Sequence, residues 1–285
     1  MKVGYFIFFV ILSMWTLSLG QYHGNISNVG TTAAPFLEIG VGARAIGMAG
    51  AFVATANDAS AIYWNPGGLG RLNRPELLFV HTKWIADINY EFAGAVIPLG
   101  RVGTAGASVT SLNMDDMLVR TVDKPEGTGE YFAVSNLALM LSYGFNLTDR
   151  FSIGFNAKYV QEKIWKESAQ SFAVDIGTIF RTSLNDMKMN GEDLLVFHDP
   201  DPYQMGNNDK IFAELKTDQW PLPLNFQFGL AMEVLKKNPH RLTIATDAMH
   251  PINNKESMHV GMEYALREQF MLRGGYRSLF LDDSE

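Results

Sequence analysis

The sequence predicts an all-β protein, a transmembrane antiparallel β-barrel, and three observations carry that prediction. Long segments alternate between bulky apolar residues and small or polar ones, as they do from Leu224 to Val234. Several of these segments reach about 10 residues, whereas soluble strands average about 5–6 and a tilted bilayer crossing needs about 9–11. After the N-terminal region, no run of 18 consecutive apolar residues occurs, so helical spans are not expected. Only helices and closed barrels satisfy the backbone in lipid, which favours a barrel in an outer membrane.

Ten segments follow the alternating pattern closely enough to be predicted as strands. They lie at about 75–84, 88–98, 101–112, 137–145, 151–159, 172–181, 224–234, 239–249, 258–266 and 269–280. Successive side chains of a strand point to opposite faces, so each segment has one bulky apolar face and one small or polar face. Aromatic residues near strand ends are candidates for interfacial girdles: Tyr143, Phe145, Tyr159, Trp165 and Trp220.

The residues on the smaller face distinguish a membrane barrel from a soluble β-sandwich, the alternative that also alternates. The polar face of a sandwich would meet water and favour Lys, Glu and Thr. Here that face is rich in Gly, Ala and Ser and carries scattered charges of both signs: Lys158, Asp175, Arg181, Glu233, Asp247, Glu263, Arg273 and Arg277. Small residues with mixed charges suit a crowded, wet barrel interior, so we expect this face to line a lumen.

Connection lengths predict an orientation for each strand. They also expose a mismatch in the number of membrane crossings, which we call the parity problem. Short turns are expected near 98–100, 146–149, 236–239 and 268, and longer connections at 113–130, 164–170 and 250–256. Outer-membrane barrels have short periplasmic turns and longer outer loops. The strand that ends near Thr182 then arrives on the periplasmic side, yet the strand from Pro221 must begin outside. Either a weak segment crosses in between, Asp193–His198 or Ile211–Leu215, or the chain lacks one strand.

Residues 184–219 are acidic, with eight Asp or Glu against three Lys. Asp199, Asp201, Asn207, Asn208 and Asp209 could hold calcium, but their spacing does not match an EF-hand loop, so a solvated outer loop is favoured. The six His residues are scattered without metal-binding spacing, and neither a GxSxG turn nor a Walker motif occurs. We therefore expect no enzyme activity, no metal and no cofactor.

The N-terminus has the pattern of a secretory signal over residues 1–20. Lys2 precedes a mostly apolar run from Val3 to Leu19, and Ser18-Leu19-Gly20 has the small-x-small form of a cleavage site. A retained membrane anchor is the alternative. Loss of Lys2 with the signal changes the formal charge from −7 to −8, and such an acidic chain argues against a nucleic-acid partner.

Residues 21–74 differ in composition from the strands and are predicted to form a plug, or hatch, before the barrel at 75–285. Gly40–Ala51 is glycine-spaced, and glycine lets one backbone pass close to another. In the following stretch, Asn57 or Asp58 could cap a short helical turn over Ala59–Trp64, which Pro66 and the next glycines would end. A flexible exported tail is the alternative, but tails rarely contain so many aliphatic and aromatic residues.

These two stretches, the glycine-arginine run and Asn65-Pro66-Gly67-Gly68-Leu69, resemble the PorV/PorQ family of outer-membrane proteins, which is related to FadL-type barrels. The resemblance is strongest over 37–72 and extends in weaker form through 281, including Asp186-Met187-Lys188-Met189 and Pro221-Leu222-Pro223-Leu224. It implies a barrel of about 14 strands with an N-terminal hatch in its lumen. It also implies a role in type IX secretion for PorV itself, and uptake of hydrophobic molecules for FadL relatives.

Two departures from that family pattern concern the number of strands. Relatives have a further strand where the parity argument requires one, and they continue beyond the end of this chain. Outer-membrane barrels usually finish with a strand that ends in an aromatic residue, whereas this sequence ends Leu281-Asp282-Asp283-Ser284-Glu285. We therefore expect C-terminal strands, about three of them, to be missing, which would leave unpaired strand edges.

Two principal functions remain open from the sequence. A secretion component would handle exported cargo proteins, with secretion-system proteins and outer-membrane lipid as partners. A FadL-like channel would instead bind a hydrophobic small molecule such as a long-chain fatty acid near the hatch. A structural barrel without transport is a third, less favoured class. The hatch residues that could bind a ligand are Arg44, Met48, Phe52, Asp58, Tyr63, Trp64, Asn65 and Pro66, although packing against the wall would explain them equally well.

Overall fold

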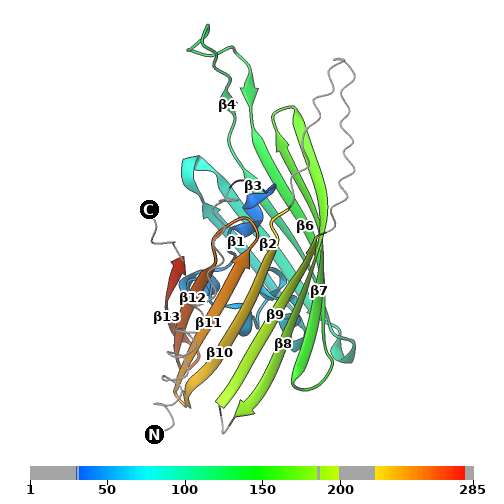
Figure 1. Ribbon diagram of the computed structural model, residues 1–285, viewed down its shortest axis with the longest axis vertical. Coiled ribbons are helices and arrows are strands. Elements are labelled where there is room, and N and C mark those ends of the chain that lie inside the picture. Colours follow the sequence, from blue (N-terminus) through cyan, green and yellow to red (C-terminus); the bar gives the residue numbers. More distant parts are fainter. Residues whose placement is uncertain (1–29, 31, 185–186, 199–221, 280–285) are drawn as a thin grey trace.

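The computed structural model describes residues 30, 32–184, 187–198 and 222–279, and its dominant feature is one curved antiparallel sheet of eleven strands (Figure 1). The strands follow the order β1-β2-β3-β6-β7-β8-β9-β10-β11-β12-β13, so every strand pairs with its neighbours in sequence except where a small ribbon, β4–β5, is inserted. β1 and β13 form the two edges, and the described sheet is open between them. The all-β, antiparallel prediction is confirmed, with eleven strands in the sheet where the family resemblance implies about 14.

The strand bounds agree with the alternating segments in most places. They are β1 Glu76–Lys83, β2 Asn89–Pro98, β3 Thr104–Asn113, β4 Met117–Leu118, β5 Tyr131–Phe132, β6 Val134–Asn146, β7 Phe151–Ile164, β8 Glu167–Leu184, β9 Met187–His198, β10 Asn225–Lys237, β11 His240–Pro251, β12 Ser257–Leu266 and β13 Phe270–Leu279. Many of these strands have 10 or more residues, which is the length that a tilted bilayer crossing requires.

The two faces of the sheet are inverted relative to those of a soluble protein. The bulky side chains of the alternating pattern are exposed on the convex face, for example Phe79 at 75% and Leu141 at 69%. The small and polar partners are buried on the concave face, including Asp175 at 3% and Glu263 at 1%. This arrangement agrees with the predicted division between an apolar outer surface and a polar interior. Within the described ranges, no helix combines the length and apolar composition that a helical membrane span needs.

The strand β9 resolves the parity problem. It pairs antiparallel with β8 through Ala173↔His198 and with β10 through Gln227↔Leu194, so it is the required crossing between them. The alternative that the chain lacks this strand is therefore wrong. Asp193–His198 is the second half of β9, while Ile211–Leu215 and the calcium candidates from Asp199 to Asp209 lie outside the described residues. The expected outer loop at 184–219 needs correction too, because residues 187–198 form a strand.

A second correction concerns the connection expected at 164–170. β7 continues to Ile164 and β8 begins at Glu167, so only two residues separate the strands. The register continues without interruption from Phe151↔Phe180 to Ile164↔Glu167, which shows that cross-strand pairing extends to the tip. The connection after β3 also contains structure, since β4 pairs with β5 in a ribbon that projects at the top of Figure 1. We call residues 114–133 the outer arm.

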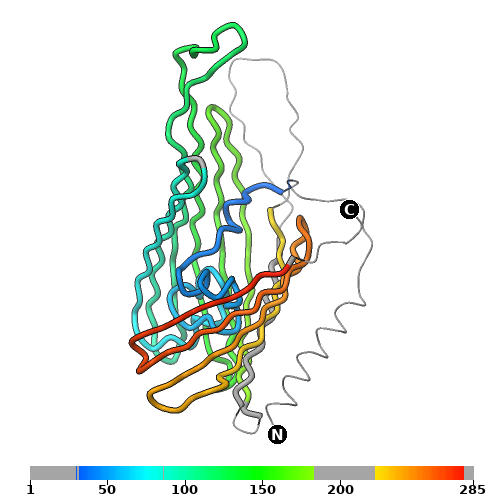
Figure 2. Tube along the Cα trace, turned by 90° about the vertical axis from the view of Figure 1, so that its left-hand side faces the viewer, coloured from blue at the N-terminus to red at the C-terminus, as the bar shows by residue number. Residues whose placement is uncertain are grey.

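The segment that precedes β1 lies on the concave side of the sheet, as Figure 2 shows for its blue trace. We call residues 32–73 the hatch. It contains short helices only: η1 Pro35–Glu38, α2 Ala43–Gly47, η2 Val53–Thr55, α3 Ala61–Trp64 and η3 Pro66–Arg71. The short helical turn predicted over Ala59–Trp64 corresponds to α3, and Asp58 Oδ1 accepts a hydrogen bond from Ser60 N at 2.9 Å just before it. The signal segment, residues 1–20, lies outside the described residues.

Candidate functional site

The candidate site is the contact between the hatch and the concave face of the sheet. Successive hatch elements contact different strands: η3 lies on β6, β7 and β8, η2 on β9, β10 and β11, and α2 on β13. The hatch therefore reaches across most of the wall rather than resting on one hairpin. Its apolar side chains fill the interior, with Val41, Met48, Phe52, Ile62 and Leu69 all fully buried.

Three glycines on neighbouring strands form a seat for η3. We call Gly144 of β6, Gly154 of β7 and Gly177 of β8 the glycine cradle; they are directly cross-strand, with Gly144↔Gly154 and Gly154↔Gly177 in register. A Cβ at Gly144 would lie 2.7 Å from Pro66 O, and one at Gly177 would lie 2.8 Å from Pro66 Cδ. Any larger residue would therefore collide with the hatch backbone, and the absence of side chains lets the two backbones approach.

Asn65 secures the start of η3 above this cradle. Its side-chain oxygen accepts a hydrogen bond from Gly67 N at 2.9 Å, which caps the helical turn. Its amide nitrogen donates to Thr178 O of β8 at 3.1 Å and to Val53 O of the hatch at 3.3 Å. One fully buried side chain thus joins η3, η2 and the wall.

A buried carboxylate on β12 anchors the segment of the hatch around Arg44. Glu263 is 1% exposed and accepts hydrogen bonds from three arginines: Arg44 of α2 at 2.9 Å, Arg273 of β13 at 2.7 Å and Arg241 of β11 at 3.1 Å. Arg44 makes a second bond to it, from Nη2 to Oε1 at 3.3 Å, so this contact is bidentate. We call Glu263 and these three arginines the charge hub.

The arginine of the hatch also organises the hatch itself. Arg44 Nη1 forms an ion pair with Asp58 at 3.1 Å and donates to Asn57 Oδ1 at 2.5 Å. Its guanidinium lies 5.0 Å from the ring centroid of Phe52, within the range of a cation–π contact. Two loops of the hatch and the wall are therefore held together through a single side chain, whose charge is shared between Glu263 and Asp58.

A second buried carboxylate binds backbone amides of the hatch. Asp247 of β11 accepts hydrogen bonds from the amides of Phe52 at 2.7 Å and Val53 at 3.0 Å, and its side chain is fully buried. Gln227 of β10 donates to the same oxygen at 3.4 Å. On the opposite wall, Asn156 donates to Ile62 O at 3.0 Å and to Asp175, which also pairs with Lys158 at 2.6 Å. These contacts satisfy backbone groups of the hatch that would otherwise be buried without partners.

The remaining ligand-binding candidates take part in packing and internal hydrogen bonds. Met48 is fully buried against Gly261 and Gly275, and Trp64 packs edge-on against Phe52 and Tyr63. Trp64 Nε1 donates to Val41 O at 2.8 Å, and Tyr63 OH donates to Leu37 O at 2.9 Å. Burial raises the pKa of Tyr63 well above its ordinary value, so its hydroxyl keeps the proton that it donates. That these residues bind a ligand stays a prediction.

A polar cavity of about 200 Å³ lies where the hatch meets β8, β10 and β11. Its lining is dominated by charged and polar side chains, among them Arg44, Asn57, Arg181, Glu233, Lys236 and Arg241. Glu233 pairs with Lys236 at 2.8 Å, and Arg241 pairs with Glu268 at 2.7 Å. A long alkyl chain gains nothing from such walls, because it would displace water from charged groups without satisfying them.

The sequence predicts the interior charges and the hatch residues as two separate groups, and the structure brings several members of the two groups together. Arg44 and Glu263, 219 residues apart, belong to the same hub, and so does Arg273. Arg241 was not among the predicted interior charges, although it lies close to the short turn between β10 and β11. The glycine cradle was visible only as small residues on the inner face. The cradle consists of one glycine at the same level of three adjacent strands, and this alignment can be recognised only when the strand register is known.

The geometry defines a class of protein: a curved antiparallel sheet with an apolar outer face and an N-terminal hatch that packs into its polar interior. The family model described as type IX secretion system protein PorV matches residues 23–191, which is more than half of the chain. The chain therefore belongs to the PorV family, an outer-membrane component of type IX secretion. The match covers the hatch and the strands from β1 into β9. It therefore includes both partners of the contact between η3 and the glycine cradle. No curated protein matches the sequence significantly.

Proposed function

We propose that this protein handles exported cargo proteins at the outer membrane as a non-enzymatic partner of other secretion-system components. In this role the barrel is a scaffold: lipid covers its convex face, the hatch closes its interior, and protein contacts are made at the outer rim. Membership of the PorV family supports the association with type IX secretion.

The observation that carries this proposal is how completely the hatch is bound to the wall. Backbone contacts in the glycine cradle, the charge hub and Asp247 hold it at three places along the sheet. Met48, Phe52, Trp64 and Asn65, the side chains best suited to line a route, are buried in these contacts. Uptake of a hydrophobic molecule would require all of them to separate, whereas binding a cargo protein at the rim requires none to move.

The outer arm supplies a protein-binding surface of the kind that this role needs. It is held in place by Val119 N→Glu130 O at 2.8 Å and by Trp165 N→Ala133 O at 3.0 Å, which ties it to the β7–β8 hairpin. Apolar side chains project from this structure into solvent: Met117, Val122, Tyr131, Ile164 and Trp165. Exposed aromatic and apolar residues on a rigid support are typical of interaction sites.

The test replaces Met117 and Tyr131 of the arm with Ser in a strain whose chromosomal copy is deleted. We expect the variant to restore surface delivery of type IX cargo poorly, with about a tenfold deficit if roughly 1.4 kcal/mol of binding is lost. A matched control changes Leu99 and Leu147 to Ser, since these two are similarly exposed at the short-turn end. Surface-exposed cargo is measured by whole-cell immunoblotting, with heat-modifiable migration as the check on folding.

Fatty-acid uptake is measured in the same strains, because it separates the two principal functions. Deletion should abolish cargo delivery and leave uptake of a labelled long-chain fatty acid unchanged. If deletion instead abolishes uptake while cargo still reaches the surface, the secretion role is rejected and the channel alternative is favoured. If the arm variant and the control deliver cargo equally well, the arm is not the contact surface.

A further inference from the structure

A depression lies on the convex face over β1, β2 and β3; we call it, together with the small residues that continue it along β2, the furrow. The strand register places outward residues side by side in successive rows: His81, Glu91 and Ser111 in the first, Phe79, Ala93 and Val109 in the second, and Leu77, Ala95 and Ala107 in the third. Alanines thus form the floor on β2, while larger side chains stand on β1. Beyond β3, Leu139 and Leu141 of β6 continue the second and third rows.

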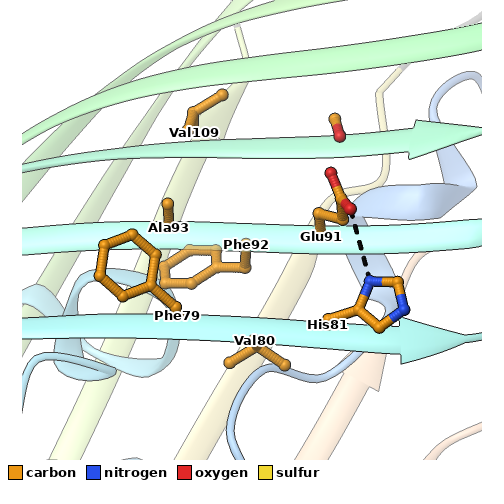
Figure 3. A pocket seen from close by; sticks show the side chains of 8 residues that line it. Phe79, Val80, His81, Glu91, Phe92, Ala93 and Val109 are labelled. Atoms are coloured by element: carbon orange, nitrogen blue, oxygen red, sulfur yellow. Dashed lines mark ion pairs between the residues drawn. The ribbon is translucent and has the colours of Figure 1, made fainter.

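The upper part of this furrow is a depression of about 360 Å³, lined by Phe79, His81, Glu91, Ala93, Val109 and Ser111 among others (Figure 3). In Figure 3, Phe79 and His81 stand on β1, and Glu91 and Ala93 stand on the neighbouring strand β2. Ala95 comes four positions after Glu91 on β2, so the furrow is about 13 Å long at ~3.3 Å per residue. An extended alkyl segment of this length could lie in it parallel to the strands.

The polar end of the furrow lies near the turn that joins β1 to β2, on the side of the outer arm. His81 is two residues before the end of β1, and Glu91 is two residues after the start of β2. Their side chains form an ion pair, with 3.4 Å between Nδ1 and Oε1, and both are more than half exposed. Charged groups on a lipid-facing surface are costly unless they meet polar partners, so this depth corresponds to the headgroup region.

We propose that the furrow is a specific site for one phospholipid whose headgroup carries both an amine and a phosphate. The acyl chain lies over Ala93 and Ala95 between Leu77 and Leu141. At the polar end, Glu91 accepts hydrogen bonds from the ammonium group, while His81 and the Ser111 hydroxyl donate to phosphate oxygens. The site rests on the proposed membrane location of the convex face, and it adds an identified lipid to the unspecific lipid contacts that any barrel makes.

Charge complementarity favours a lipid over a protein segment as the occupant. The pair His81–Glu91 offers one donor group and one acceptor group at the level of the headgroups, and only apolar side chains lie below it. A zwitterionic lipid presents its charges and its chain in that same order. A protein segment at this depth would have to bury its own backbone groups against alanine and phenylalanine side chains, which cannot satisfy them.

Native mass spectrometry of the full chain in detergent tests the site with two probes, dioleoyl phosphatidylethanolamine and dioleoyl phosphatidylglycerol. We expect one retained molecule of the first lipid and little of the second, which lacks the amine. Ala93→Leu combined with Ala95→Leu fills the furrow and should lower occupancy about tenfold, equivalent to roughly 1.4 kcal/mol. The control, Ala157→Leu with Ala248→Leu, adds the same atoms to exposed positions of the convex face on β7 and β11.

The outcomes separate this site from the proposed function. Glu91→Gln should remove the preference for the amine-containing lipid and leave retention of a lipid intact. Equal retention by the furrow variant and the control, or no retained lipid in a chain that inserts normally into bilayers, overturns the site alone. A chain that fails to insert into bilayers at all overturns the membrane location on which both proposals rest.

Discussion

Two segments of the hatch, residues 43–53 and 65–71, which we call its two ends, are held to the wall by different physical means. At one end, residues 65–71 lie in the glycine cradle of β6, β7 and β8, where backbone meets backbone. At the other end, residues 43–53 are held over β10 to β13 by buried carboxylates, Glu263 and Asp247. The first attachment depends on shape, and the second depends on charge and on hydrogen-bond acceptors placed at the right positions.

This difference indicates which end can be released. Contacts in the cradle are short-range and are lost as soon as the backbone withdraws, with no compensating interaction in water. The groups of the charge hub, by contrast, regain hydration when they separate, which offsets part of the lost attraction. We therefore expect the end at 43–53 to open more easily than the end at 65–71, and three substitutions test the comparison.

The largest effect is expected from Glu263→Gln, which removes the negative charge that three arginines share. Loss of one partner from a buried ion pair typically costs about 3–5 kcal/mol. The effect should be confined to one end of the hatch. Because the chain contains no cysteine, single thiols at Ala45 and Leu69, both buried, can report on the two ends separately by their labelling rates. Labelling should accelerate at position 45 and not at position 69.

The control for this substitution is Glu268→Gln, which also removes a carboxylate that pairs with Arg241. Glu268 is mostly exposed, and the hydrogen bond from Arg241 holds its pKa below the usual range. Exposed ion pairs contribute at most about 1 kcal/mol, so the free energy of unfolding in urea should change little. Equal labelling at positions 45 and 69 in Glu263→Gln would show that the hatch moves as one unit.

Gly154→Ala should have a smaller effect on stability, at the opposite end of the hatch. The added methyl group would collide with Pro66 O and would lie 2.7 Å from Gly67 N, so η3 must shift away from the wall. Overpacking of this kind costs about 1–3 kcal/mol, and labelling should now accelerate at position 69. Gly274→Ala on β13 is the control, because nothing lies within 4 Å of a Cβ there. Identical unfolding midpoints for the two variants would contradict the steric role of the cradle.

The smallest effect is expected from Trp64→Phe, which lies between the two ends. The change removes the donor to Val41 O, and one lost hydrogen bond costs about 1 kcal/mol. Since Trp64 contacts Phe52 on one side and is followed directly by Asn65, both reporter positions should respond by similar small amounts. Trp165→Phe, on the exposed β7–β8 hairpin, should leave both labelling rates unchanged. A response at only one position would show that Trp64 belongs to that end alone.

Much of the fold could be predicted because alternation survives in most strands. From Leu137 to Phe145 the bulky residues lie on the convex face and Ala138, Met140 and Ser142 are buried, as expected. For the strand β9, connection lengths predict a crossing, with Asp193–His198 as one of two candidates, but its bounds are not predicted because Met187–His198 has no clear two-residue period. Its pairing with β8 and β10 defines it. The sequence predicts a connection at 164–170 and not the paired tip of the β7–β8 hairpin, because polar residues such as Lys163 and Glu167 extend pairing beyond the apolar part of the strands.

The sequence by itself determined which face of each strand is apolar, that an N-terminal glycine-rich segment is a separate unit, and that charges of both signs lie inside. These properties follow from local periodicity and composition, which need no knowledge of distant contacts. Only the tertiary structure decided that Arg44 meets Glu263, that three glycines align beneath Pro66, and that Ala93 lies in a depression beside Phe79 and Val109. Such contacts depend on strand register and on the path of the hatch, because both bring together residues that the linear chain keeps far apart.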